Sequence, residues 1–139
     1  MRHGSRWTLA LIITAGLALA GCRAEPATAT GDSGQATVES IAGSDVKRVT
    51  LTQRAADRLG IQTVAVRAGS VPYSAVIYDT AGATWVYTVP QSLTYVREKV
   101  VVAKVGAADA TLWVGPAAGT LVVVTGVPEL FGAELGIGS

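Results

Sequence analysis

Short stretches of alternating apolar and polar residues fill the chain from residue 46 onward, and clusters of Gly, Pro, Asp and Ser separate them. A period of two residues is typical of β-strands. The pattern predicts strands at residues 46–51, 61–66, 71–78, 83–89, 94–105, 110–114 and 121–125. The last stretch is almost entirely apolar, which predicts a strand that is buried on both faces.

One short helix is predicted between the first two strands, at residues 53–59. Thr52 is a favourable N-cap residue, and Gly60 suits the position after the last turn because glycine adopts left-handed backbone angles without steric cost. Residues 129–135 are predicted as a tail or a single helical turn. These elements predict a mainly β fold, a small antiparallel β-barrel or sandwich with one short helix.

The segment before this domain has a different composition. Ala, Thr, Gly and Ser dominate residues 23–45, which contain no aromatic residue and show neither apolar period. Such a composition predicts a flexible linker. We therefore expect a linker over residues 22–45, a folded domain over residues 46–135 and a short tail over residues 136–139.

The N-terminus carries the pattern of an export signal. Arg2 and Arg6 precede fourteen uncharged residues at 7–20, which is too short for a membrane-spanning helix of about 20 residues and suits the apolar part of a signal peptide. The sequence LAGC at residues 19–22 then resembles the lipobox of bacterial lipoproteins.

The lipobox resemblance implies a signal peptide over residues 1–21, cleavage between Gly21 and Cys22, and a lipid chain such as palmitate on Cys22. The protein would then be anchored to the extracytoplasmic face of the cell membrane, at the cell surface or in the periplasm. Two alternatives remain open: cleavage after Ala20 with plain secretion, and an uncleaved anchor.

The composition excludes several functional classes. The 139 residues include 11 basic and 10 acidic side chains, so no basic excess supports nucleic-acid binding. His3 is the only histidine and Cys22 the only cysteine, which excludes a disulfide, a zinc cluster and a histidine-based catalytic triad in the domain. We predict no catalytic residue, no metal and no cofactor, and therefore no enzyme.

The polar residues of the domain fit structural roles. Asp79 is expected to open a turn, and residues 97–99 are expected on a solvated strand face. Glu129 and Glu134 are five positions apart without another neighbouring acid, which gives no support to the paired carboxylates of a glycosidase.

The aromatic residues of the domain are the candidates for a partner surface, because Trp and Tyr are favoured at the centres of interfaces. Trp85 and Tyr87 have an alternative role as core residues of a hairpin. The candidate surface consists of Tyr73, Tyr78, Trp85 and Tyr87, and Trp113 has the same chemistry.

The folded part contains a series of motifs: LGIQT at 59–63, VPYSAVIYD at 71–79, WVY at 85–87, YVR at 95–97, LVVVTG at 121–126, and Glu129-Leu130. The series resembles the periplasmic adaptor proteins, or membrane fusion proteins, of RND-type efflux pumps. The resemblance covers residues 46–135 and implies the membrane-proximal β-domain of that family.

The chain also departs from that family. Full adaptors carry a β-barrel, a lipoyl-like domain and a helical hairpin where this chain has only residues 67–70. The resemblance thus implies a truncated adaptor, a lipid-anchored accessory protein that contacts an RND-type or other membrane transporter. The alternative is a surface lipoprotein that binds a small molecule in the barrel mouth; a deep apolar cavity would favour it, and a flat exposed aromatic patch would favour the accessory protein.

Overall fold

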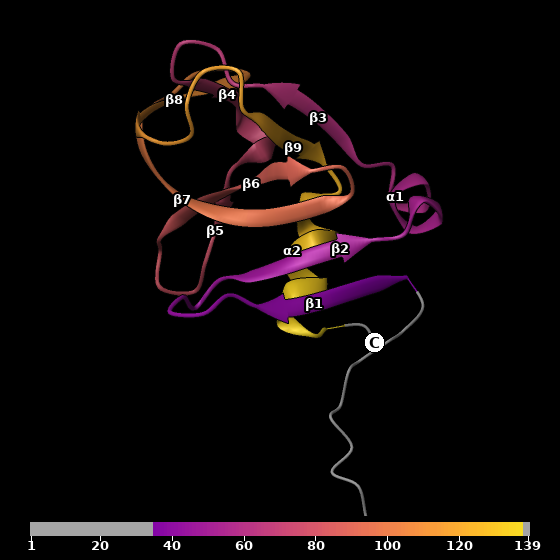
Figure 1. Ribbon diagram of the computed structural model, residues 1–139. Helices are drawn as coiled ribbons and strands as arrows, with labels where there is room; N and C mark the ends of the chain where they lie inside the picture. The colour runs from indigo at the N-terminus through magenta and orange to yellow at the C-terminus, as the bar shows by residue number, and fades with distance from the viewer. Residues whose placement is uncertain (1–34, 138–139) are drawn as a thin grey trace, which may run out of the picture.

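The structure is a computed structural model and describes residues 35–137 (Figure 1). The predicted signal peptide, Cys22 and most of the predicted linker lie outside these residues. The described part contains nine strands, two α-helices and one 3₁₀ turn. The elements are β1 (Ala36–Ser40), β2 (Lys47–Leu51), α1 (Gln53–Leu59), β3 (Gln62–Ala65), β4 (Ser70–Pro72), the 3₁₀ turn (Tyr73–Ala75), β5 (Ile77–Tyr78), β6 (Thr84–Gln91), β7 (Thr94–Val105), β8 (Asp109–Val114), β9 (Leu121–Thr125) and α2 (Val127–Leu135).

All strand pairs are antiparallel, which confirms the predicted mainly β, antiparallel fold. The main path through the sheet is β1-β2-β7-β6-β9-β3; β5 also pairs with β6, and β8 pairs with both β7 and β4. The sheet is not closed into a barrel, because β1 and β3 end the path without pairing with each other. Figure 1 shows β1 at one end of the molecule, and β3 and β4 at the other.

In the centre of the sheet, β6 and β9 bury residues on both faces, whereas β7 is buried only in part, because its residues from Val101 to Val105 are mostly exposed. Val122 and Val123 are consecutive in β9 and both fully buried, which confirms the prediction for this strand. Val123 belongs to a core cluster that includes α1 and α2, whereas Val122 belongs to a second cluster with β4, β8 and the 3₁₀ turn. Both helices therefore pack on the same side of the central strands.

Local capping explains α1, which has the predicted bounds. Thr52 Oγ1 accepts a hydrogen bond from the Ala55 N–H at 3.2 Å, and Gly60 has a φ of 62°.

The second helix is longer than the predicted single turn. It begins after Gly126 and carries Pro128 in its first turn. Proline is tolerated there because the N–H groups of the first turn have no acceptor within the helix.

Two other predictions were wrong. Residues 36–40 lie in the predicted linker but pair with β2 over five consecutive residue pairs. Their apolar pattern is weak because β1 is an edge strand, and Val38 remains 37% exposed. The predicted strand at 71–78 is divided by the 3₁₀ turn, in which the Val76 N–H donates to the Tyr73 carbonyl at 3.0 Å.

Candidate functional site

The last turn of α2 places a glutamate in the protein core. Glu134 is only 2% exposed. Its Oε2 accepts a hydrogen bond from the Tyr87 hydroxyl at 2.5 Å, and its Oε1 accepts one from the Lys47 backbone N–H at 3.2 Å. Arg97 Nη2 lies 3.1 Å from Oε1. We call these four residues, Lys47, Tyr87, Arg97 and Glu134, the Glu134 cluster.

The cluster joins elements that are distant in sequence. Lys47 begins β2, Tyr87 lies in β6, Arg97 lies in β7 and Glu134 lies in α2. An acidic residue in the last turn of a helix is unfavourable to the helix dipole. The contacts to the sheet therefore explain why a glutamate occupies this position. In addition, the Lys47 Nζ donates to the Glu134 backbone carbonyl at 3.2 Å, and a cation at the C-terminal end of a helix is stabilising.

The cluster keeps the Tyr87 hydroxyl protonated. Burial raises the pKa of Tyr87 strongly, and the hydrogen bond to Glu134 raises it further. The hydroxyl thus acts as a donor to the carboxylate throughout the physiological pH range. This assignment makes Tyr87 a core residue, because it is fully buried and cannot contribute to a partner surface.

Arg97 contradicts the prediction of a solvated strand face. Its side chain is 10% exposed, and its guanidinium carbon lies 4.4 Å from the centre of the Trp85 ring and 5.3 Å from that of Phe131. Within residues 35–137, Arg97 Nε is a buried donor without a hydrogen-bond partner. The prediction failed because α2, which supplies Glu134 and Phe131, was not foreseen as a full helix. Lys99, two residues further along β7, is exposed as expected.

Trp85 connects the cluster to the hairpin turn between β5 and β6. Its Nε1 donates to Asp79 Oδ2 at 2.9 Å. Asp79 Oδ1 accepts from the N–H groups of Ala81 and Ala83 at 2.9 and 2.8 Å, which confirms Asp79 as a turn residue. These hydrogen bonds, that of Trp85 first, lower the pKa of Asp79. Trp85 itself is half-buried.

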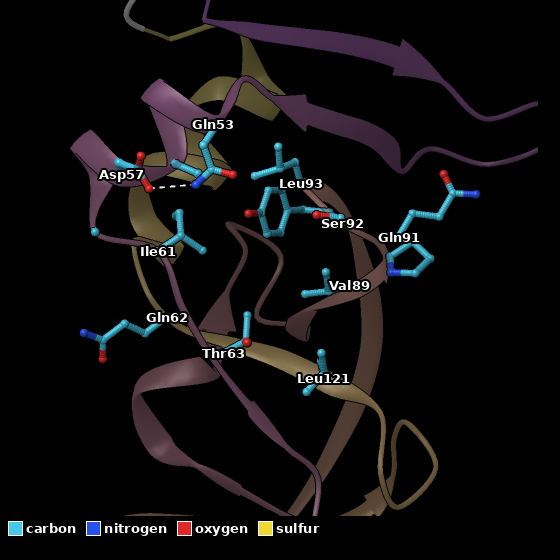
Figure 2. A pocket seen from close by; sticks show the side chains of 14 residues that line it. Gln53, Asp57, Ile61, Gln62, Thr63, Val89, Gln91, Ser92, Leu93 and Leu121 are labelled. Atoms are coloured by element: carbon cyan, nitrogen blue, oxygen red, sulfur yellow. Dashed lines mark hydrogen bonds between the residues drawn. The ribbon is translucent and has the colours of Figure 1, made fainter.

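An open groove of about 750 Å³ lies between α1, β3 and the loop that joins β6 to β7 (Figure 2). Ile61, Val89 and Leu121 supply apolar surface, and amide and hydroxyl side chains alternate with it. Asp57 is the one acidic or basic residue of the lining, and its Oδ1 accepts from Gln53 Nε2 at 2.8 Å. The groove can contact a neutral molecule, but it brings no acid–base pair together and does not include the Glu134 cluster.

Two of the predicted surface residues are exposed and adjacent. Tyr73 is 42% exposed and Tyr78 is 50% exposed, and their hydroxyl oxygens are 3.4 Å apart. The hydrogen bond to Tyr73 raises the pKa of Tyr78. The structure therefore brings these two tyrosines together and separates them from the buried Tyr87.

The most exposed apolar side chains of the sheet lie on β7 and β8. Val101 pairs with Val114, and these residues are 45% and 58% exposed. Trp113 is the extra residue where the register shifts, and it is 79% exposed. We call Val101, Trp113 and Val114 the β7–β8 strip. In the sequence, Trp113 and Val114 are consecutive, and strand alternation alone predicts that their side chains lie on opposite faces; the register shift at Trp113 interrupts this alternation.

Comparison of the chain with protein-family models, with curated proteins and with solved structures finds no match. The fold defines the chain as a mainly β protein with an open antiparallel sheet. Within residues 35–137, no three His, Cys, Asp or Glu side chains are grouped so that they could hold a metal ion. In the same residues, neither helix has the length and apolarity needed to cross a bilayer.

Proposed function

We propose that this protein is a lipid-anchored, extracytoplasmic accessory protein that acts by contact with a membrane transporter, in the manner of a truncated periplasmic adaptor. The observation that carries the proposal is the β7–β8 strip. A tryptophan that is 79% exposed beside two exposed valines is a typical protein-contact surface, because burial of such side chains drives association.

The N-terminal sequence supports the same proposal. The LAGC motif at residues 19–22 would place a lipid on Cys22, only thirteen residues before the described part begins. A tether of this length keeps the domain close to the membrane and raises its effective concentration for a membrane-embedded partner. A weak contact surface is then sufficient for association.

The chemistry of the described residues favours a binding role over a catalytic one. The buried carboxylate of Glu134 is engaged by Tyr87, Arg97 and the Lys47 backbone, and it does not line the groove between α1 and β3. Its polar neighbours are thus committed to holding α2 on the sheet. We therefore place the function on the surface and not in the core.

The proposal is tested by photo-crosslinking in native membranes, with mass spectrometry of the captured proteins. A photoreactive phenylalanine analogue replaces Trp113 in one variant and Glu129, an exposed residue of α2, in the matched control. We expect capture of a transporter subunit from position 113, loss of that capture in a Cys22→Ser background, and no capture from position 129. Equal capture from both positions, or no transporter at position 113, would contradict the proposal.

The groove supports one alternative function, the binding of a neutral small molecule. Its 750 Å³ volume suits a ligand of ordinary size, and its lining combines apolar contacts with side-chain amides. A thermal-shift screen of neutral compounds tests it. A hit that a Leu121→Lys substitution abolishes would favour this function over the transporter contact.

A further inference from the structure

The two ends of the sheet differ in how well they are protected against further strand pairing. β3 ends the sheet with four residues and a register shift between Gln62 and Thr63. β4 has three residues and includes Pro72, which has no N–H to offer. Bulges, short strands and proline are the usual means by which proteins prevent edge-to-edge association.

Among residues 35–137, β1 pairs only with β2, and it has none of these protections. It pairs with β2 over five consecutive residues without a register shift, and it contains no proline and no lysine. Four of its five residues are exposed. A regular, exposed edge strand presents a row of backbone donors and acceptors to which another strand can add.

The hydrogen-bond pattern identifies the free backbone groups of β1. The Thr52 N–H donates to the Gln35 carbonyl at 3.0 Å, so residue 35 faces β2. Because successive residues of a strand turn their backbone groups to opposite sides, Ala36, Val38 and Ser40 direct their N–H and C=O groups toward the free edge.

We propose that β1 is the interface for a second copy of this chain, whose β1 pairs with it in antiparallel orientation about a twofold axis at Val38. In this register Ala36 pairs with Ser40 of the second copy and Val38 with its own equivalent. Each of these pairs can exchange both backbone hydrogen bonds, so all free groups of the strand are used.

The side chains suit this register. Val38, which is 37% exposed, meets its equivalent, and Glu39 lies opposite Thr37 of the second copy. No like charges face each other, whereas a register centred on Glu39 would oppose two carboxylates. Glu39 also keeps its ion pair with Arg48 on the neighbouring strand, at 3.4 Å.

The end of α2 extends the proposed interface. α2 packs beside β1 in Figure 1, and the last apolar residues of the described chain, Leu135 and Ile137, are 52% and 70% exposed. A twofold axis perpendicular to the sheet places both copies of α2 on the same face of the extended sheet. Burial of these side chains between the copies would add apolar area to the strand pairing.

The pairing itself does not rest on the proposed function, since it requires only that two copies meet, whereas its dependence on lipidation rests on the lipid anchor proposed at Cys22. A single added strand gives a small interface, so we expect weak association in solution and stronger association where two copies share a membrane. Loss of lipidation would therefore reduce the extent of pairing and leave its register unchanged.

Site-specific disulfide crosslinking of the full chain tests the register. Equivalent residues of a hydrogen-bonded pair have Cα atoms about 5.5 Å apart, which a disulfide can bridge, so Val38→Cys should crosslink on oxidation of native membranes. In the matched variant Thr37→Cys, the two cysteines are displaced along the strands by roughly 7 Å and should not crosslink. The unsubstituted chain reports any crosslinking through Cys22.

A second variant tests the hydrogen bonds themselves. Val38→Pro removes an N–H that faces the free edge and not β2, so the fold should survive, as shown by its circular dichroism spectrum and thermal unfolding. In sedimentation analysis of the detergent-purified chain, we expect a dimer fraction that increases with protein concentration, and no such fraction for Val38→Pro. Equal crosslinking at positions 37 and 38, or a monomeric unsubstituted chain together with no crosslink at position 38, would overturn the proposal, whatever the outcome of the transporter experiment.

Discussion

Replacement of Glu134 by glutamine tests whether the Glu134 cluster holds α2 on the sheet. The amide has nearly the shape of the carboxylate and can still accept from the Tyr87 hydroxyl, but it carries no charge. Arg97, whose side chain is 10% exposed, then loses its one ion pair within residues 35–137. A buried guanidinium without a counter-charge is strongly destabilising.

The expected loss follows from the burial of this pair. Removal of one partner from a buried ion pair costs roughly 3–5 kcal/mol in the free energy of unfolding. We expect about 3 kcal/mol, the low end, because the rings of Trp85 and Phe131 still contact the Arg97 guanidinium. A domain of this kind has a total stability of roughly 5–15 kcal/mol, so the variant should unfold at a much lower denaturant concentration.

Urea unfolding followed by tryptophan fluorescence and circular dichroism measures this loss. Glu129→Gln is the matched control: it lies in the same helix, is exposed, and should lose only about 0.3–1 kcal/mol from its place in the first turn. A double substitution, Glu134→Gln with Arg97→Met, removes both charges, keeps an acceptor for the Tyr87 hydroxyl and should be more stable than Glu134→Gln alone. Equal stability of Glu134→Gln and Glu129→Gln would refute the reasoning.

Two further predictions concern turns. The pKa of Asp79 is lowered below its ordinary value of 3.8, so its contribution to stability is complete above that value and is lost as the pH falls through the folded-state pKa. Asp79→Asn should therefore be less stable than the unsubstituted chain at neutral pH and should approach it in acid, as urea unfolding across pH will show; a difference independent of pH would contradict this. Gly126 has a φ of 83°, and an added Cβ would overlap the end of the Ile61 side chain, which would have to shift, whereas Gly43, with a φ of 75°, has open space. Gly43→Ala should cost about 1–2 kcal/mol and Gly126→Ala clearly more in thermal unfolding, and equal costs would rule out the steric argument.

The sequence was sufficient for elements that are specified locally. Thr52 and Gly60 fixed both ends of α1, and the long apolar alternation fixed β7 with its observed bounds, Thr94–Val105. These features depend on residues within one turn or one strand, so they can be predicted without knowledge of the rest of the fold.

The Glu134 cluster could not be predicted in this way. Tyr87 and Glu134 are 47 positions apart, and the partners of the glutamate lie on three different strands. A charged residue near the end of a chain is normally exposed, and only the tertiary packing of α2 buries this one. The same packing explains why Arg97 was assigned to a solvated face. β1 was not predicted because an edge strand needs few apolar residues and therefore shows little apolar alternation in the sequence.

The Glu134 cluster has a consequence for the order in which the protein folds. The carboxylate and the Lys47 N–H that it accepts from are 87 positions apart, and α2 follows every strand in the sequence. Until α2 docks, β7 would carry Arg97 on its inner face without a counter-charge, which makes the completed sheet unfavourable on its own. Docking of the helix and consolidation of the sheet should therefore occur in one cooperative step, and a chain still lacking its last helix would remain largely unfolded.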